Sequence, residues 1–153
     1  MPGEKIICTN KQARFDYHLE DRYEAGLVLQ GTEVKSLRDG RANLKDSYAV
    51  VDGGEVYLYN CHISPYPNGG YANHEPQRVR KVLLHRKEIR RLVGKTQERG
   101  LTLIPLRLYF LRGKAKVELA LARGKKQYDK REDMKQRDAD REIERAFRER
   151  HRG

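Results

Sequence analysis

Apolar and polar residues alternate along much of this 153-residue chain, and the alternation restricts its fold more than any other feature. A period of two is the side-chain repeat of a strand that buries one face. The alternating segments are 17–29 (with a break at 21–22), 47–51, 55–59, 101–112 and 114–123. Two glycine-containing segments, Asp52-Gly53-Gly54 and Arg112-Gly113, separate neighbouring alternating segments, as in β-hairpin turns. The pattern therefore predicts about five or six antiparallel strands.

Two shorter segments have helical spacing instead. The apolar positions of residues 32–38 recur at helical intervals, and Gly40 follows as a stop. A second helix is predicted from about residue 86, with its stop at Gly100. Residues 64–76 contain three prolines and predict a long loop. Together the elements favour an all-β, antiparallel barrel of the oligonucleotide-binding kind, with about six strands and short helices.

The end of the chain cannot belong to that barrel. Of the 22 residues from 132 to 153, 14 are charged, so burial cannot offset the entropy lost on ordering them. Ile143, Ala146 and Phe147 nevertheless form a short stripe at helical spacing. We predict a barrel domain over 1–123 and a tail over 124–153 that is disordered alone and helical when bound to a partner. A merely solubilising extension is the alternative.

Positive charge is concentrated in one part of the barrel domain. The formal net charge is +11, and residues 1–123 hold +8 of it, because 124–153 carry 11 Lys or Arg against 8 Asp or Glu. Between residues 78 and 99 lie nine basic residues and two acidic ones. Such a concentration of charge is typical of a protein that binds a polyanion. Nucleic acid is the polyanion that we favour.

An anionic membrane is the second choice, and the sequence gives it less support. A membrane-binding helix needs an apolar face with Trp or Phe, whereas this chain has no Trp and a mean hydropathy of −0.92. No stretch approaches 18 apolar residues, and no apolar run follows the first residues, so we expect neither a membrane span nor a secretory signal. Cys8 and Cys61 have no metal-ligand spacing and are expected to be reduced thiols of a cytoplasmic protein.

The sequence contains no pattern typical of a catalytic site. Its five histidines lie in different segments, without a His or Cys partner at metal-ligand spacing. There is no Gly-x-Ser-x-Gly elbow, and the acidic residues are scattered. We therefore expect a binding protein without catalytic residues, metal or cofactor. A nuclease whose carboxylates converge in space and a general single-strand RNA binder remain as alternatives.

The second predicted helix is the strongest binding candidate. Its apolar face needs Ile89, Leu92 and Val93, which leaves its basic residues facing outward. These basic residues are Arg86, Lys87, Arg90, Arg91 and Lys95. Arginine pairs with phosphate through two parallel hydrogen bonds, so this row favours a nucleic-acid backbone. Nine tyrosines and three phenylalanines offer further surfaces on which bases could stack.

A long segment also matches a known family. Residues 24–38, EAGLVLQGTEVKSLR, resemble the signature of the SsrA-binding protein (small protein B) family, the bacterial partner of transfer-messenger RNA. The similarity continues in one register through NKQAR, DSY, RKVLLH and GKKQYDKR, at residues 10–14, 46–48, 80–85 and 124–131. It departs at Phe15 and Tyr128, where relatives carry His. His85 is Asn in some relatives.

The resemblance implies a non-enzymatic barrel that holds the tRNA-like domain of transfer-messenger RNA. Its partners would be that RNA, elongation factor Tu with GTP, and the stalled ribosome, where the tail enters the empty mRNA channel at the decoding centre of the small subunit. We expect a monomer when free. The resemblance also implies that Glu24, Leu83 and His85 contact this RNA. Combined with the basic residues, the candidate RNA-binding set is Lys11, Arg14, Glu24, Arg80, Lys81, Leu83, His85, Arg86, Lys87, Arg90, Arg91, Lys125 and Lys126. The candidate decoding-site residues are Tyr128, Asp129, Lys130 and Arg131.

Overall fold

The computed structural model describes residues 4–99, 101–124, 141 and 145. Three α-helices occur in this part of the chain: α1 (Gln12–Asp16), α2 (Gly31–Arg38) and α3 (Arg86–Arg99). The strands are β1 (Glu4–Thr9), β2 (Tyr17–Leu27), β3 (Ala42–Asn43), β4 (Tyr48–Asp52), β5 (Glu55–Tyr59), β6 (His62–Ile63), β7 (Arg80–Leu83), β8 (Thr102–Leu111) and β9 (Lys114–Gly124). A single 3-10 turn, Gly70–Ala72, interrupts the predicted long loop.

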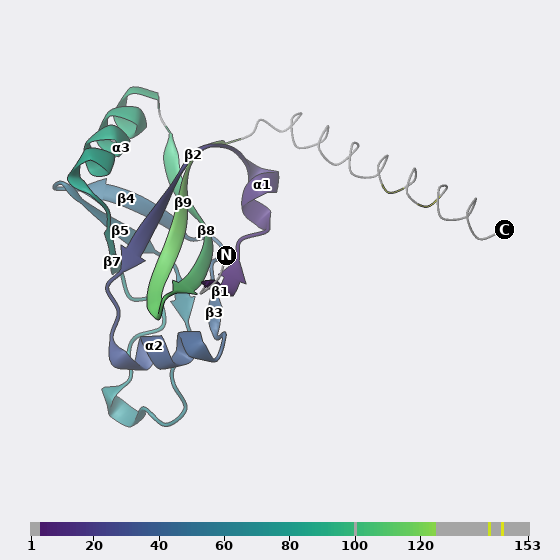
Figure 1. The fold of residues 1–153 in the computed structure, drawn as a ribbon, viewed down its shortest axis with the longest axis vertical. Helices are drawn as coiled ribbons and strands as arrows, with labels where there is room; N and C mark the ends of the chain where they lie inside the picture. The colour runs from purple at the N-terminus through teal and green to yellow at the C-terminus, as the bar shows by residue number, and fades with distance from the viewer. Residues whose placement is uncertain (1–3, 100, 125–140, 142–144, 146–153) are drawn as a thin grey trace.

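Six strands form a closed ring in the order β8-β4-β5-β7-β2-β9, and the pairing of β9 with β8 completes it (Figure 1). Every pairing is antiparallel. Strand β1 pairs with residues 107–111 of β8, beyond the point where β4 pairs with Leu103, while β3 and β6 form a separate two-stranded sheet. A closed ring leaves no free edge among its members, which explains how short strands can be stable here. The predicted barrel is confirmed.

Both predicted hairpin turns are present. Gly53 and Gly54 have φ of 58° and 79° between β4 and β5, and Arg112 and Gly113 have φ of 52° and 77° between β8 and β9. Two consecutive residues with positive φ make the tight turn whose twist suits a right-handed hairpin. Glycine adopts this conformation without strain, which is why these turns could be read from the sequence.

The break in the alternation of β2 is a register shift. The pairing of β2 with β9 skips between Leu19 and Arg22, at the position where the sequence pattern fails. Such a bulge bends the strand, so that β2 pairs with β9 along most of its length and also with β7 at its end. Beyond it, Gly26 pairs with both β9 and β7, and a Cβ at this position would lie 3.5 Å from Leu83. The bend therefore brings β7 close to the end of β2.

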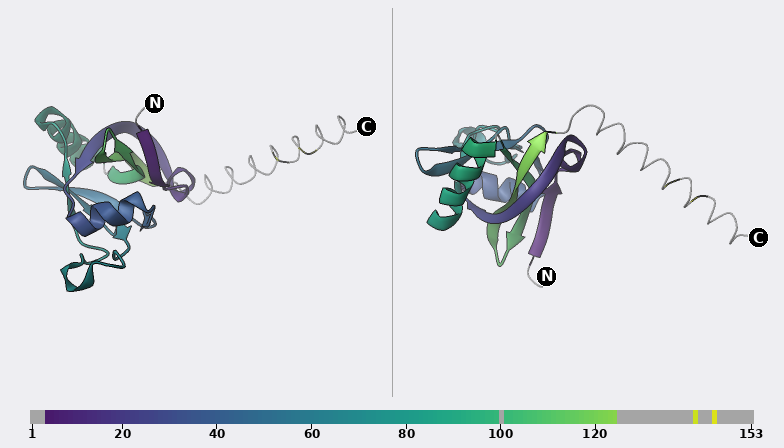
Figure 2. Two further views of the ribbon diagram at one scale, coloured as in Figure 1. Left: turned by 60° about the horizontal axis from the view of Figure 1, so that its bottom comes forward. Right: turned by 90° about the horizontal axis from the view of Figure 1, so that it is seen from above.

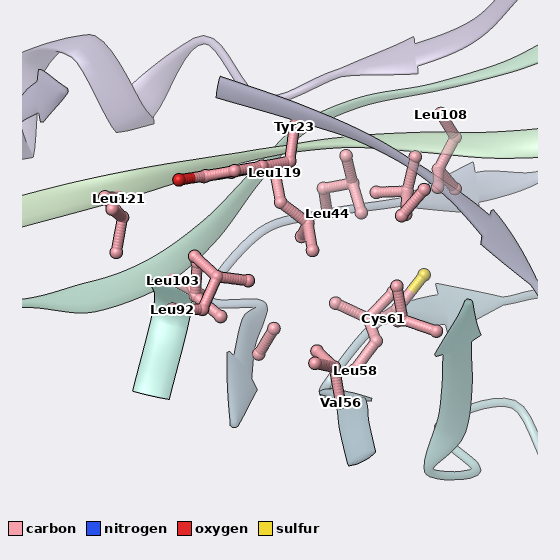
Figure 3. Close-up of a cluster of buried hydrophobic side chains, with 14 of the residues drawn as sticks. Tyr23, Leu44, Val56, Leu58, Cys61, Leu92, Leu103, Leu108, Leu119 and Leu121 are labelled. Atoms are coloured by element: carbon pink, nitrogen blue, oxygen red, sulfur yellow. The ribbon is translucent and has the colours of Figure 1, made fainter. Parts of the chain in front are cut away.

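Both predicted helices are confirmed, and each contributes to the barrel core. Figure 3 shows Leu92 of α3 pointing at side chains from the strands. The core contains Tyr23, Ala25, Leu37, Leu44, Val56, Leu58, Cys61, Ile63, Leu92, Leu103, Leu108, Val117, Leu119 and Leu121, among others. Burial raises the pKa of Cys8 to about 11 and that of Cys61 to about 12, so both thiols stay protonated and poorly nucleophilic near neutral pH.

Five of the helices and strands were not predicted from the sequence: β1, β3, β6, β7 and α1. Strand β1 contains the adjacent apolar residues Ile6 and Ile7, which do not alternate, because an edge strand that pairs with β8 alone has no strictly buried face. Helix α1 has five residues, too few for a helical period to appear. The tail, predicted over 124–153, lies outside the described residues except for positions 124, 141 and 145, so its order stays a prediction.

Candidate nucleic-acid interface

A groove of about 660 Å³ opens on one side of the barrel. It lies between the end of β2, the junction of β7 with α3, and the turn that joins β8 to β9. Glu24, Leu83 and His85 all line it, although they come from separate parts of the chain. These are the three residues that the family resemblance singled out for RNA contact. The fold brings them together, and their contact with RNA stays a prediction.

The exposure of Leu83 points to a binding surface. Leu83 lies in β7, yet 51% of its surface is accessible, whereas its neighbour Val82 is buried at 1%. Side chains of a strand point alternately to its two faces, so burial of Val82 places Leu83 on the outer face of β7. An exposed leucine in a groove lined by both polar and apolar side chains is a surface on which a base or ribose could pack.

Two cations of this groove were missed in the sequence analysis. Lys114 and Lys116 line it from the start of β9. Their signal was present, because both occupy polar positions of the alternating segment directly after the turn at Gly113. Two lysines in a strand segment are a weaker signal than the nine basic residues between 78 and 99, so the charge pattern pointed to α3 instead.

Helix α3 presents its basic residues as the sequence predicted. Arg86, Lys87, Arg90 and Arg91, hereafter the α3 cations, are exposed, while Ile89 and Leu92 on the opposite face are buried. The helix begins at the groove, since His85 and Glu88 line it. The backbone N–H of His85 donates to the Glu88 carboxylate at 3.2 Å. This bond satisfies one of the N–H groups that have no partner within the helix at its N-terminus. Lys95 differs from the α3 cations, because it is half-buried and forms an ion pair with Asp21.

One predicted RNA contact is wrong. Arg80 was placed in the RNA-binding set, but its side chain is completely buried. It forms an ion pair with Glu33, which is also completely buried, and donates to the backbone oxygens of Cys61 at 2.6 Å and Pro76 at 3.0 Å. A guanidinium with these partners serves the fold, because removing it from water requires a full set of acceptors. Lys81 stays at the surface, 3.4 Å from Glu55.

Glu33 is the centre of this buried network. It accepts hydrogen bonds from Arg78 at 2.6 Å, from the backbone N–H of Gln30 at 2.7 Å, and from Arg80. Burial alone would raise the pKa of Glu33, but the hydrogen bonds from Arg78, Gln30 and Arg80 outweigh it and lower the pKa below its ordinary value of 4.5. Glu33, Arg78 and Arg80, hereafter the Glu33 network, join α2 to the strand that carries Leu83.

The remaining described candidates lie elsewhere. Lys11 and Arg14 are exposed at α1, which Figure 2 shows on the side of the barrel away from α3. A second groove of about 690 Å³ adjoins α1 and is lined by Asn10, Tyr17 and Lys45, among others. Tyr17, which follows α1, pairs with Gly124, so strand β9 ends beside α1. The predicted residues Lys125, Lys126, Tyr128, Asp129, Lys130 and Arg131 lie outside the described residues.

No metal site or membrane helix is found within the described ranges. In residues 4–99 and 101–124, no three His, Cys, Asp or Glu side chains gather closely enough to hold a metal ion. Over the same part of the chain, no helix has the length and apolar character needed to cross a bilayer.

The ring of antiparallel strands and the groove beside a basic helix define a small barrel of the oligonucleotide-binding kind with one cationic side. The family model of the SmpB protein matches residues 7–149. An SsrA-binding protein of Geobacillus thermodenitrificans is 65% identical over 146 residues, covering 95% of this chain and 94% of that protein. An SsrA-binding protein of Geobacter sulfurreducens is 60% identical over 147 residues, covering 96% of each. The chain therefore belongs to the SmpB family.

A solved structure agrees with this assignment. A chain from the work described as "tmRNA-SmpB: a journey to the center of the bacterial ribosome" superposes with a TM-score of 0.66 at 55% sequence identity. The match covers 78% of the present chain and 85% of the other. The barrel is thus shared with a chain studied together with transfer-messenger RNA and the ribosome.

Proposed function

We propose that this protein is an RNA-binding adaptor that holds the tRNA-like domain of transfer-messenger RNA and delivers it to stalled ribosomes for trans-translation. The observation that carries the proposal is the groove that unites Glu24, Leu83 and His85 beside the α3 cations. A tRNA-like fold offers phosphates and exposed base edges, and this surface has a partner for each. The names of the relatives, SsrA-binding protein, support the same RNA.

The proposal gives the two sides of the barrel different tasks. The groove, Lys114, Lys116 and the α3 cations would meet transfer-messenger RNA. The side of α1, with Lys11 and Arg14, would face ribosomal RNA, because the chain leaves the barrel there at Gly124. Residues 125–153 would then enter the mRNA channel of the small subunit, with Tyr128–Arg131 at the decoding centre. The delivery complex would include elongation factor Tu and GTP, and the free protein would be a cytoplasmic monomer without catalytic activity.

Binding measurements test the choice of RNA. The affinity for transfer-messenger RNA is measured against bulk tRNA and an unstructured RNA, each at two salt concentrations. We expect a clear preference for transfer-messenger RNA at both. Equal affinity for all three RNAs would leave a general RNA binder. Magnesium-dependent cleavage of labelled RNA in the same samples would instead indicate a nuclease.

Deletion of residues 132–153 tests the separation of tasks. We expect the shortened protein to bind transfer-messenger RNA with nearly unchanged affinity, because the groove and the α3 cations lie in the barrel. It should fail to support tagging in a translation reaction stalled on an mRNA without a stop codon. A large loss of RNA affinity would show that the tail belongs to the RNA-binding surface.

A further inference from the structure

We propose that Tyr109 is a positioning residue of the groove: its hydroxyl holds one oxygen of Glu24 and thereby presents the other oxygen to hydrogen-bond donors of the bound RNA. The inference rests on the proposed function, because it concerns how the groove recognises its RNA. Tyr109 itself lies in β8, is 1% exposed and does not line the groove. Its effect on RNA would therefore be transmitted through Glu24.

The geometry joins the two residues across a strand. The Tyr109 hydroxyl donates to Oε2 of Glu24 at 2.6 Å. Glu24 lies in β2 and Tyr109 in β8, and β9 runs between them, with Glu24 opposite Glu118 and Tyr109 opposite Lys116. The tyrosine ring thus spans β9 diagonally to reach the carboxylate. Since no hydrogen bond to Oε1 occurs among the described residues, that oxygen has an acceptor site to offer.

Tyr109 is itself held firmly. The guanidinium of Arg107 lies over its ring, 4.2 Å from the centroid, and Arg107 in turn forms ion pairs with Glu4 and Glu118. Burial raises the pKa of the Tyr109 hydroxyl, and the hydrogen bond to Glu24 raises it further, so the hydroxyl remains a donor throughout the neutral pH range. Because the contact with Arg107 holds the Tyr109 ring in place, its hydroxyl can fix the orientation of the exposed Glu24 side chain, which would otherwise sample several rotamers.

The charge of Glu24 defines what it can recognise. A carboxylate accepts hydrogen bonds and repels phosphate, so its RNA partner is a base amino or imino group or a ribose hydroxyl. Phosphates are left to Lys114 and Lys116, which line the same groove, and to the α3 cations. Glu24 would therefore distinguish one RNA from another through bases and riboses, whereas Lys114, Lys116 and the α3 cations would bind the phosphates that every RNA has.

The test is a double-mutant cycle with the substitutions Tyr109→Phe and Glu24→Ala. The probe is a transcript of the tRNA-like domain of transfer-messenger RNA, and the readouts are its dissociation constant and the thermal unfolding of each variant. Tyr109→Phe keeps the ring and its contact with Arg107, so the fold should persist. We expect the affinity to fall by about fivefold, since binding must then immobilise a free Glu24 side chain. In the Glu24→Ala background, Tyr109→Phe should change the affinity no further.

Tyr23→Phe is the matched control. Tyr23 is also buried, at 7% exposure, but its hydroxyl has no hydrogen-bond partner among the described residues. Its loss should leave RNA affinity unchanged. Equal affinity of Tyr109→Phe and wild type would overturn the inference, as would a loss that persists undiminished in the Glu24→Ala background or a Glu24→Ala variant that binds normally. Failure of the wild type to prefer this RNA would instead overturn the proposed function.

Discussion

Arg80 and Arg90 belong to one basic run of the sequence, yet the fold gives them opposite environments. Arg80 is completely buried against Glu33, whereas Arg90 is exposed on α3. The two residues are only ten positions apart, but Arg80 has a buried carboxylate as its partner and Arg90 has none among the described residues. The comparison shows that the density of positive charge in a sequence overstates the charge that a ligand meets, because part of it is neutralised inside the fold. The α3 cations are the part that remains available.

Removal of Arg80 should have the largest effect on stability. Arg80→Met leaves the buried carboxylate of Glu33 with Arg78 and the Gln30 N–H, so we expect a loss of about 3 kcal/mol, the lower end for breaking a buried ion pair. Urea unfolding measures it. Arg90→Met is the control at an exposed site and should stay within about 0.5 kcal/mol of wild type. Equal losses for both would remove the distinction between the two arginines.

Neutralisation of the α3 cations should act on RNA and leave the fold intact. Replacing Arg86, Lys87, Arg90 and Arg91 by Gln is expected to weaken binding of transfer-messenger RNA by about 10- to 100-fold at moderate salt. The plot of log affinity against log salt should become shallower by about 0.7 for each lost phosphate contact. Unfolding in urea should change little. An unchanged slope would place the phosphate contacts on another side of the barrel.

The Glu33 network should also make stability depend on pH. The folded pKa of Glu33 lies below 4.5, so its ionised form stabilises the fold above that pH, and this contribution is lost as the pH falls through the folded pKa. Glu33→Gln cannot titrate. The stability advantage of wild type over Glu33→Gln should therefore be present at pH 7 and shrink in acid. Parallel stability curves from neutral pH to about pH 3 would contradict the lowered pKa.

The smallest effect on stability and RNA binding is expected at Lys95, whose burial lies between that of Arg80 and that of Arg90. Its ammonium group is paired with Asp21, and 31% of the side-chain surface remains exposed. Lys95→Gln should cost at most about 1 kcal/mol, as is usual for ion pairs in contact with water. Its effect on the salt dependence of RNA binding should also be smaller than that of Arg90→Gln. A larger effect on RNA binding would add Lys95 to the α3 cations.

Much of this architecture could be read from local patterns. The two hairpin turns at 52–54 and 112–113, the break at 21–22 and the exposed face of α3 each depend on residues adjacent in the chain. The family resemblance implied that Glu24, Leu83 and His85 contact RNA, but only the fold shows that they line one groove. Lys114 and Lys116 had a local signal as polar positions of an alternating strand. Tyr109 could not be singled out, because an aromatic position in a strand carries no local sign of what lies across the sheet.

The sequence by itself determined five of the six strands of the ring, their two hairpin turns, helices α2 and α3 and the sign of the charge, because each follows from side-chain periodicity or from simple composition. Which charges meet solvent was decided by the tertiary structure. Glu33 and Arg80 lie 47 positions apart in the chain, and the pairing of β2 with β7 brings the helix that follows β2 into contact with Arg80 in the interior. Glu24 and Tyr109, separated by 85 positions, meet across β9 for the same reason. Antiparallel pairing joins distant segments, and local patterns cannot specify which partner a buried polar group will find.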